Sequence, residues 1–232
     1  MSVSPDVTSP SLPATEPGRD PTRRSVLAPP RHPIVVEALT IARRWCDGHE
    51  IDGAPAITHA VRVADLLGQH LPDAPPALVA AVLLHDVPDY TGPEQFGAEV
   101  SDRCGTDTLI ALWLIHGEHI AMEQHRHDPD GAVHRLSQLR PDIAAALAAD
   151  KVISLTYVLG NARQAPDIRA YWAARRPFLL LVPYLRTFLK ATGPQLPDGL
   201  ADELGGLLRE ARRALVLAAH VPTIRPHAAR PA

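Results

Sequence analysis

Apolar residues recur at helical spacing along most of the chain. In residues 34–45, for example, Val35, Leu39 and Ala42 lie on one face of a helix because they are separated by four and then three positions. No segment alternates apolar and polar residues as a half-buried strand does, and no hairpin signal or internal repeat is present. The pattern therefore predicts an all-α fold. The helices expected from it cover residues 34–45, 57–71, 77–87, 93–105, 106–117, 141–159, 167–192 and 200–219.

Three segments depart from this pattern. Residues 1–31 are rich in Pro, Ser and Thr and poor in large apolar side chains, so they are expected to be disordered. Residues 221–232 have a similar composition and the same expectation applies to them, which leaves a helical domain over 32–220. Residues 116–140 are polar and are expected to be irregular.

Composition and charge narrow the class of protein. The chain has 232 residues, of which 46% are hydrophobic, and a formal net charge of −3. The absence of a basic stripe predicts no nucleic-acid partner, and the mild acidity argues against an anionic membrane surface. No window approaches the ~18 apolar residues of a membrane span and no secretory signal is recognisable, so we expect a soluble cytoplasmic protein. Cys46 and Cys104 form no CxxC pair, which fits a reducing compartment but leaves one disulfide possible.

Four side chains that can bind metals interrupt apolar helices. His59 lies near the start of one predicted helix, His85 and Asp86 end a second that is apolar nearly all round, and Asp150 lies in the middle of a third. A buried carboxylate is very costly unless it is paired or bound to a metal. Two imidazoles and two carboxylates around one cation would suit manganese, iron or zinc.

The flanks of these four residues resemble those of the HD-domain metal-dependent phosphohydrolases, whose signature is H…HD…D. GAPAITHAVRVADLL, LVAAVLLHDVPDYTG, EQFGAEVSDRCG and LAADKVISL each resemble a motif of that family, in the same order. The likeness spans roughly residues 33–192. It is greatest to the RelA/SpoT-type guanosine tetraphosphate hydrolases, including the small free-standing ones.

This resemblance implies a metal and a mechanism. His59, His85, Asp86 and Asp150 would hold one divalent ion, most simply Mn²⁺, with Fe²⁺ or Zn²⁺ as alternatives. A bound water would attack a phosphoryl group of a nucleotide-like substrate, for which guanosine tetraphosphate is one candidate. Two catalytic acids follow the HD pair in the family, and the matching residues here are Asp89 and Tyr90.

The resemblance also marks four candidate substrate-binding positions at which the chain differs from the family. Trp45 replaces a histidine and Glu50 replaces a basic residue that would meet phosphate, while Ser154 replaces an asparagine. Lys151, beside the candidate ligand Asp150, completes the set. These replacements leave a second interpretation open, in which the protein is a catalytically degenerate HD-domain module that binds a nucleotide or a partner. In a third interpretation the same four ligands support different chemistry, such as an iron-dependent oxidation.

A rival metal site is conceivable in the polar segment that follows. Two of its histidines, His116 and His119, are three positions apart, and two others flank a predicted turn. The simpler interpretation of this composition is a solvated polar loop. The histidines of the segment are His116, His119, His125, His127 and His134.

Overall fold

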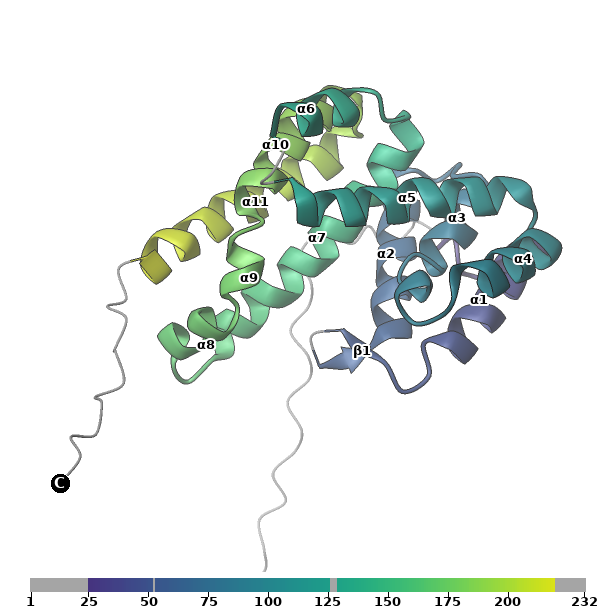
Figure 1. Cartoon of the computed structure of the whole chain (residues 1–232), viewed down its shortest axis with the longest axis horizontal. Coiled ribbons are helices and arrows are strands. Elements are labelled where there is room, and N and C mark those ends of the chain that lie inside the picture. The colour runs from purple at the N-terminus through teal and green to yellow at the C-terminus, as the bar shows by residue number, and fades with distance from the viewer. Residues whose placement is uncertain (1–24, 52, 126–128, 220–232) are drawn as a thin grey trace, which may run out of the picture.

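The computed structural model describes residues 25–51, 53–125 and 129–219, and helices dominate this part of the chain (Figure 1). The prediction of an all-α fold is confirmed. The predicted disorder of residues 1–24 and 221–232 concerns residues outside the described part of the chain. The elements are α1 (Pro33–Trp45), β1 (Glu50–Ile51), β2 (Ala54–Pro55), α2 (Ala56–His70), α3 (Pro76–Leu83), η1 (Val87–Asp89), α4 (Pro93–Cys104), α5 (Thr106–Gln124), α6 (Pro129–Ser137), α7 (Pro141–Gln164), α8 (Ile168–Ala174), α9 (Arg176–Leu179), α10 (Val182–Thr192), η2 (Gly193–Gln195) and α11 (Asp198–Ala219).

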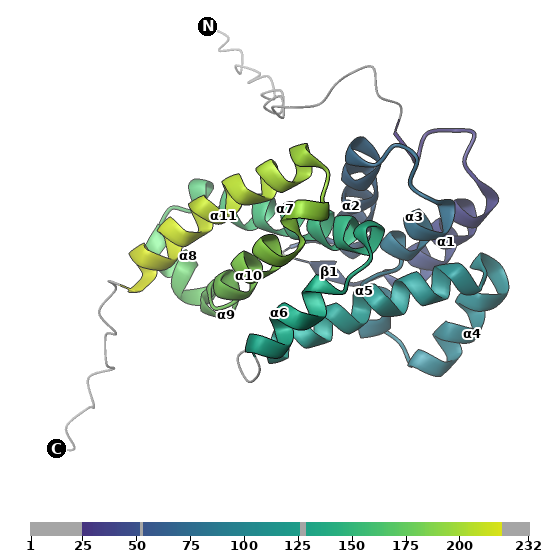
Figure 2. The same cartoon turned by 90° about the horizontal axis from the view of Figure 1, so that it is seen from above.

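Helix α7 is the central element of the fold. It packs against α2, α3 and α5 on one side of the molecule and against α8, α10 and α11 on the other. Figures 1 and 2 show these two groups of helices at opposite ends of the molecule, with α7 running between them. Residues 143–149 are all buried, and the five alanines among them let neighbouring helices approach closely. The core is therefore continuous through α7.

Helix α7 is also long and apolar enough to cross a membrane by length and composition alone. The expectation that no segment approaches this limit was wrong. Two thirds of the apolar window are buried inside the fold, as in the core helix of a folded domain. Asp150 and Lys151 lie near its middle and are both buried among other helices.

Helix α3 brings a polar pair into the core. Its residues from Leu78 to Leu83, and Leu84 directly after it, are all almost completely buried, as the sequence predicts. The α-helix ends at Leu83, earlier than the expected residue 87, and the chain then turns into the 3₁₀ helix η1. Pro88 lies in this 3₁₀ turn, where its missing N–H breaks no α-helical hydrogen bond. His85 and Asp86 consequently occupy the turn between the two helices.

The segment expected to be irregular is largely helical. Helix α5 continues to Gln124, well beyond residue 117, and α6 follows after a short connection. A buried ionic network ties these elements together: the Arg135 guanidinium donates to both carboxylate oxygens of Glu118, and the Tyr184 hydroxyl donates to the same carboxylate. Because the partners are 17 and 66 residues from Glu118 in sequence, local composition could not reveal that this polar side chain is buried.

The helix predicted over residues 167–192 is divided into α8, α9 and α10. Pro177 and Pro183 lie in the first turns of α9 and α10, where the missing proline N–H groups cost nothing. Apolar spacing alone did not separate these three helices, because each of them buries apolar residues against the same core.

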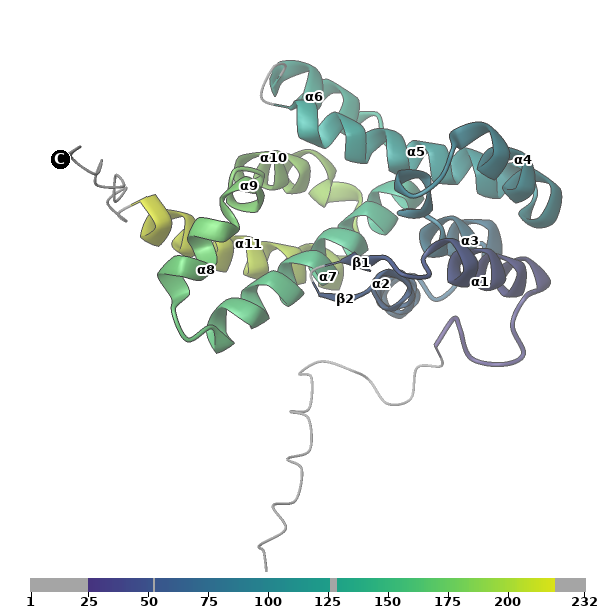
Figure 3. The same cartoon turned by 60° about the horizontal axis from the view of Figure 1, so that its bottom comes forward.

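Two smaller features also differ from expectation. Residues 25–31 were expected to be disordered, but Leu27 is buried and Ser25 hydrogen-bonds to Asp65 of α2. Strands β1 and β2 form a two-residue antiparallel ribbon beside the start of α2 (Figure 3). Cys46 and Cys104 are both free and buried, so they form no disulfide.

Helix α5 offers a matched test of the core. Leu112 is fully buried, whereas Leu114 on the same helix is 41% exposed. We expect Leu112→Ala to lower the free energy of unfolding by about 2–5 kcal/mol, because it removes buried methyl groups and leaves a cavity. Leu114→Ala should change it by no more than about 0.5 kcal/mol. Urea unfolding followed by circular dichroism measures both, and equal losses would contradict the packing of α5.

Candidate metal centre

The structure brings the four candidate ligands together from three elements. His59 lies in the first turn of α2, His85 and Asp86 lie in the turn after α3, and Asp150 lies midway along α7. One ligand atom each of His59, His85 and Asp86 falls within 4.8 Å of the other two. Asp150 Oδ1 lies 3.1 Å from His59 Nε2 and 3.6 Å from His85 Nε2. Residues 91 positions apart in sequence therefore share one centre.

The orientation of His85 suits a metal ligand. Its Nδ1 donates to the carbonyl of Val82 over 2.6 Å, which fixes the ring and leaves Nε2 facing the cluster. Both His85 Nε2 and Asp86 Oδ2 are buried, and neither has a hydrogen-bond partner in the described part of the chain. Buried polar atoms without partners are uncommon and call for an explanation. The His59–His85–Asp86 group could hold a metal ion, which would satisfy both atoms.

A further histidine joins the centre from α5. His119 Nε2 lies 3.3 Å from Asp150 Oδ2, and its ring centre is 5.6 Å from that of His85. The expectation that His119 lies in a solvated polar loop was wrong, because this residue lies within α5. The three-residue spacing from His116 was the available signal, since it places both rings on one side of a helix once α5 is known to continue.

Opposing charges set the ionisation of this cluster. Burial alone would raise the pKa of Asp150, but the hydrogen bond with His59 and the close imidazoles of His119 and His85 hold it well below its usual value. For His85, burial opposes the positive charge, yet the nearby carboxylates of Asp86 and Asp150 outweigh it and raise the pKa to about 9. In the metal-free protein, a protonated His85 thus balances part of the buried negative charge at neutral pH.

The two candidate catalytic residues lie at the edge of the cluster. Asp89 is largely exposed, and its Oδ1 is 3.9 Å from His116 Nδ1, a buried atom without a hydrogen-bond partner in the described chain. Tyr90 stacks on His49 with the ring centres 4.0 Å apart. Burial and the charge of Asp86 raise the pKa of Tyr90, so its hydroxyl stays protonated and can donate a hydrogen bond.

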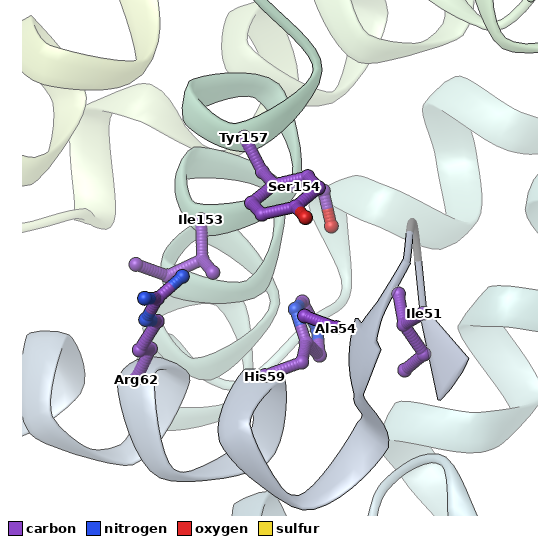
Figure 4. Close-up of a pocket in the computed structure, with 7 residues that line it drawn as sticks. All are labelled: Ile51, Ala54, His59, Arg62, Ile153, Ser154 and Tyr157. Atoms are coloured by element: carbon purple, nitrogen blue, oxygen red, sulfur yellow. The ribbon is translucent and has the colours of Figure 1, made fainter. Parts of the chain in front are cut away.

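A small cavity of about 10 Å³, with room for about one water molecule, opens beside His59 (Figure 4). Its walls come from the β1–β2 ribbon, from α2 and from the face of α7 one turn beyond Asp150. Ser154 lines it, and its hydroxyl lies 3.5 Å from Asp150 Oδ1. Arg62 and Tyr157 also line it, and the sequence analysis did not identify either as a binding residue.

The other three candidate substrate-binding residues do not line this pocket. Trp45 donates from its indole nitrogen to Glu99 over 3.2 Å, and Glu50 is exposed in β1. Lys151 is almost fully buried, with its ammonium 3.9 Å from Asp150 Oδ2 and 4.9 Å from the ring centre of Phe188. Burial lowers the pKa of Lys151. The Lys151 ammonium group therefore lies in the core, between Asp150 and Phe188.

Comparison of the sequence with protein-family models and with curated proteins returned no match. The resemblance to HD-domain phosphohydrolases therefore stays a prediction, and the geometry of the centre carries the functional argument.

The pKa of His85 predicts how metal binding responds to pH. A metal must displace the proton that His85 carries below pH about 9, so each unit of pH below that value lowers the neutral fraction of His85 about tenfold. We expect the apparent affinity for Mn²⁺ to rise about tenfold per unit from pH 7 to 9 and to level off above it. Anaerobic calorimetric titrations at four pH values, in two buffers to count released protons, measure this. An affinity that is constant across the range would contradict it.

Proposed function

We propose that the protein is a metal-dependent phosphohydrolase of the HD type that acts on a small nucleotide-like phosphate ester or pyrophosphate. The observation that carries the proposal is the convergence of His59, His85, Asp86 and Asp150, with buried atoms that lack partners, next to a pocket. The ordered set of flanking motifs supports the same class. Guanosine tetraphosphate is one candidate substrate, although the family's basic residue at position 50 is a glutamate here.

The four converging residues would hold the cation, and Mn²⁺ is the ion that the resemblance favours. A bound divalent cation polarises phosphoryl oxygens and lowers the pKa of a coordinated water. His85 is fixed by its bond to Val82 and presents Nε2 to the cation. Asp150 would offer Oδ1 to the same centre, while His119 Nε2 lies 3.3 Å from its other carboxylate oxygen.

Proton transfer would fall to residues at the edge of the centre. Asp89 and His116 lie close to each other, so together they could accept a proton from the attacking water and pass it to solvent. Burial lowers the pKa of His116, which keeps its imidazole neutral and able to accept. Tyr90 keeps its proton, so it would orient a water or substrate oxygen by donating a hydrogen bond.

The exposure of Asp89 favours one alternative, a catalytically degenerate module that binds a nucleotide without turnover. At 58% exposure its carboxylate is loosely held, and Tyr90 supplies no second carboxylate. In that case metal and nucleotide would still raise the melting temperature, because any ligand that binds only the folded state stabilises it. No product would form.

Hydrolysis is tested by incubating the purified protein with Mn²⁺ and a nucleotide library that includes guanosine tetraphosphate. We expect release of phosphate or pyrophosphate, and we expect Asp86→Asn and Asp150→Asn to lower kcat by more than about 100-fold because each removes a carboxylate from the cation. Asp142→Asn, on the same helix as Asp150 but paired with Arg140 outside the centre, is the matched control.

Turnover that is indifferent to Asp86 and Asp150 would rule out this mechanism. Stabilisation by Mn²⁺ and a nucleotide without any product would instead identify the binding module. The two outcomes are separated by measuring melting temperature and product release in the same samples.

His119 is a positioning residue for Asp150 in this proposal. His119→Gln should reduce kcat or Mn²⁺ affinity by about 10–100-fold, the range found for partners that orient metal ligands. His134→Gln, an exposed histidine of α6, should have no effect. A purely structural role for His119 would lower the melting temperature and leave the kinetics of the folded fraction intact, so both are measured.

A further inference from the structure

The buried ammonium group of Lys151 is a charge that the catalytic proposal does not use. Lys151 is 3% exposed, and its Nζ has no hydrogen-bond partner among the described residues. It lies 3.9 Å from Asp150 Oδ2 and 4.9 Å from the ring centre of Phe188. Burying a charge without hydrogen bonds is costly, so its presence next to a candidate metal ligand calls for an explanation.

The two carboxylate oxygens of Asp150 have different neighbours. Oδ1 lies 3.1 Å from His59 Nε2 and 3.6 Å from His85 Nε2, so it faces the two imidazoles of the centre. Oδ2 lies 3.3 Å from His119 Nε2 and 3.9 Å from Lys151 Nζ. Oδ1 is therefore the oxygen placed to meet a cation that His59 and His85 share. Oδ2 lies beside a positive charge that would repel the same cation.

The core holds the Lys151 ammonium group in this place. It lies over the ring of Phe188, which is fully buried in α10, and a cation is attracted to the face of an aromatic ring. Burial lowers the pKa of Lys151, but the carboxylates of Asp150 and Glu118 act in the opposite direction and favour the ammonium form. Because nearly all of the side chain is buried, the ammonium group cannot reach solvent without a rearrangement of the core.

We propose that Lys151 is a positioning residue that weakens the hold of the centre on its cation. Its ammonium group acts on Asp150 Oδ2, so that Asp150 meets the cation through Oδ1 alone, and its charge also repels the cation directly. A divalent cation that is shared by fewer carboxylate oxygens is a stronger Lewis acid. This inference rests on the proposed phosphohydrolase function and adds to it a residue that is not itself a ligand.

The sign of the effect on metal binding separates this role from a packing role. If Lys151 only supported Asp150, its removal would weaken metal binding, as is found for partners that orient metal ligands. If its charge opposes the cation, its removal strengthens metal binding. His119 differs from Lys151 in this respect, because a neutral imidazole orients Asp150 without repelling the cation.

The inference is tested by anaerobic calorimetric titration of Mn²⁺, without substrate and at one fixed pH, into wild type, Lys151→Met and Lys151→Gln. We expect both variants to bind Mn²⁺ at least about tenfold more tightly than wild type, because a positive charge 3.9 Å from Asp150 Oδ2 no longer opposes the ion. Lys151→Arg, which keeps the charge, should stay within about threefold of wild type. Lys190→Met, which removes an exposed ammonium group of α10, is the matched control and should have no effect.

Melting temperatures of the metal-free proteins confirm that each variant is folded. Unchanged or weaker Mn²⁺ binding in the two uncharged variants would overturn the inference, as would a Lys151→Arg variant that binds Mn²⁺ as tightly as they do. Product release from a nucleotide library is followed with the same proteins. Hydrolysis together with unchanged Mn²⁺ affinity in the variants would retain the enzyme and refute this role of Lys151. Tighter Mn²⁺ binding in the variants, without hydrolysis by any of the proteins, would do the reverse.

Discussion

The constraint on which the rest of the structure depends is the cost of burying two carboxylates and several histidines inside a helical core. Asp150 meets that cost by lying against His59, His85 and His119, which arrive from α2, the turn after α3, and α5. Each of these elements also packs against α7, so the apolar contacts of the core fix where the polar atoms meet. The hydrogen bonding within this cluster is incomplete, because His85 Nε2 and Asp86 Oδ2 have no hydrogen-bond partner in the described chain. A cation bound by these two atoms would supply the missing interactions. The same ion would then stabilise the fold and take part in the proposed reaction.

Helix α7 combines two properties that rarely occur together in one segment. Its alanines allow close helix packing on both sides, and its central Asp150 and Lys151 introduce charges that only tertiary partners can balance. The same composition makes the helix apolar enough to satisfy a membrane-span test, although most of that apolar surface faces other helices. Burial within a folded core therefore accounts for its hydropathy. The Glu118–Arg135–Tyr184 network begins at the residue that precedes His119 on α5, and it links α6 and α10 to this helix.

The candidate metal centre contains the residues that the sequence predicted for it, whereas the pocket beside it contains mostly other residues than those predicted. The centre requires particular side chains at fixed positions, and the four residues of the H…HD…D pattern meet in space. The pocket contains Ser154, Tyr157 and Arg62 together with apolar residues of the ribbon, whereas Trp45 is bonded to Glu99 and Lys151 is buried. The close approach of these four residues supports the proposed metal centre, whereas the lining of the pocket does not identify its ligand.

The sequence by itself determined the helical class and most helices, because each helix buries a stripe of apolar residues that local spacing reveals. Polar groups inside apolar segments stand out against their neighbours, so the sequence also indicated four candidate metal ligands. These are His59, His85, Asp86 and Asp150. Only the tertiary structure decided the rest. The helical state of residues 116–124 and the burial of Glu118 depend on Arg135 and Tyr184, and the breaks around α9 divide a segment that looks continuous in apolar spacing. His119 lies beside Asp150 because α5 packs against α7, and local sequence patterns do not reveal such a contact between two helices. Local patterns specify which face of a helix is buried, but the contacts made on that face arise from packing between elements distant in sequence.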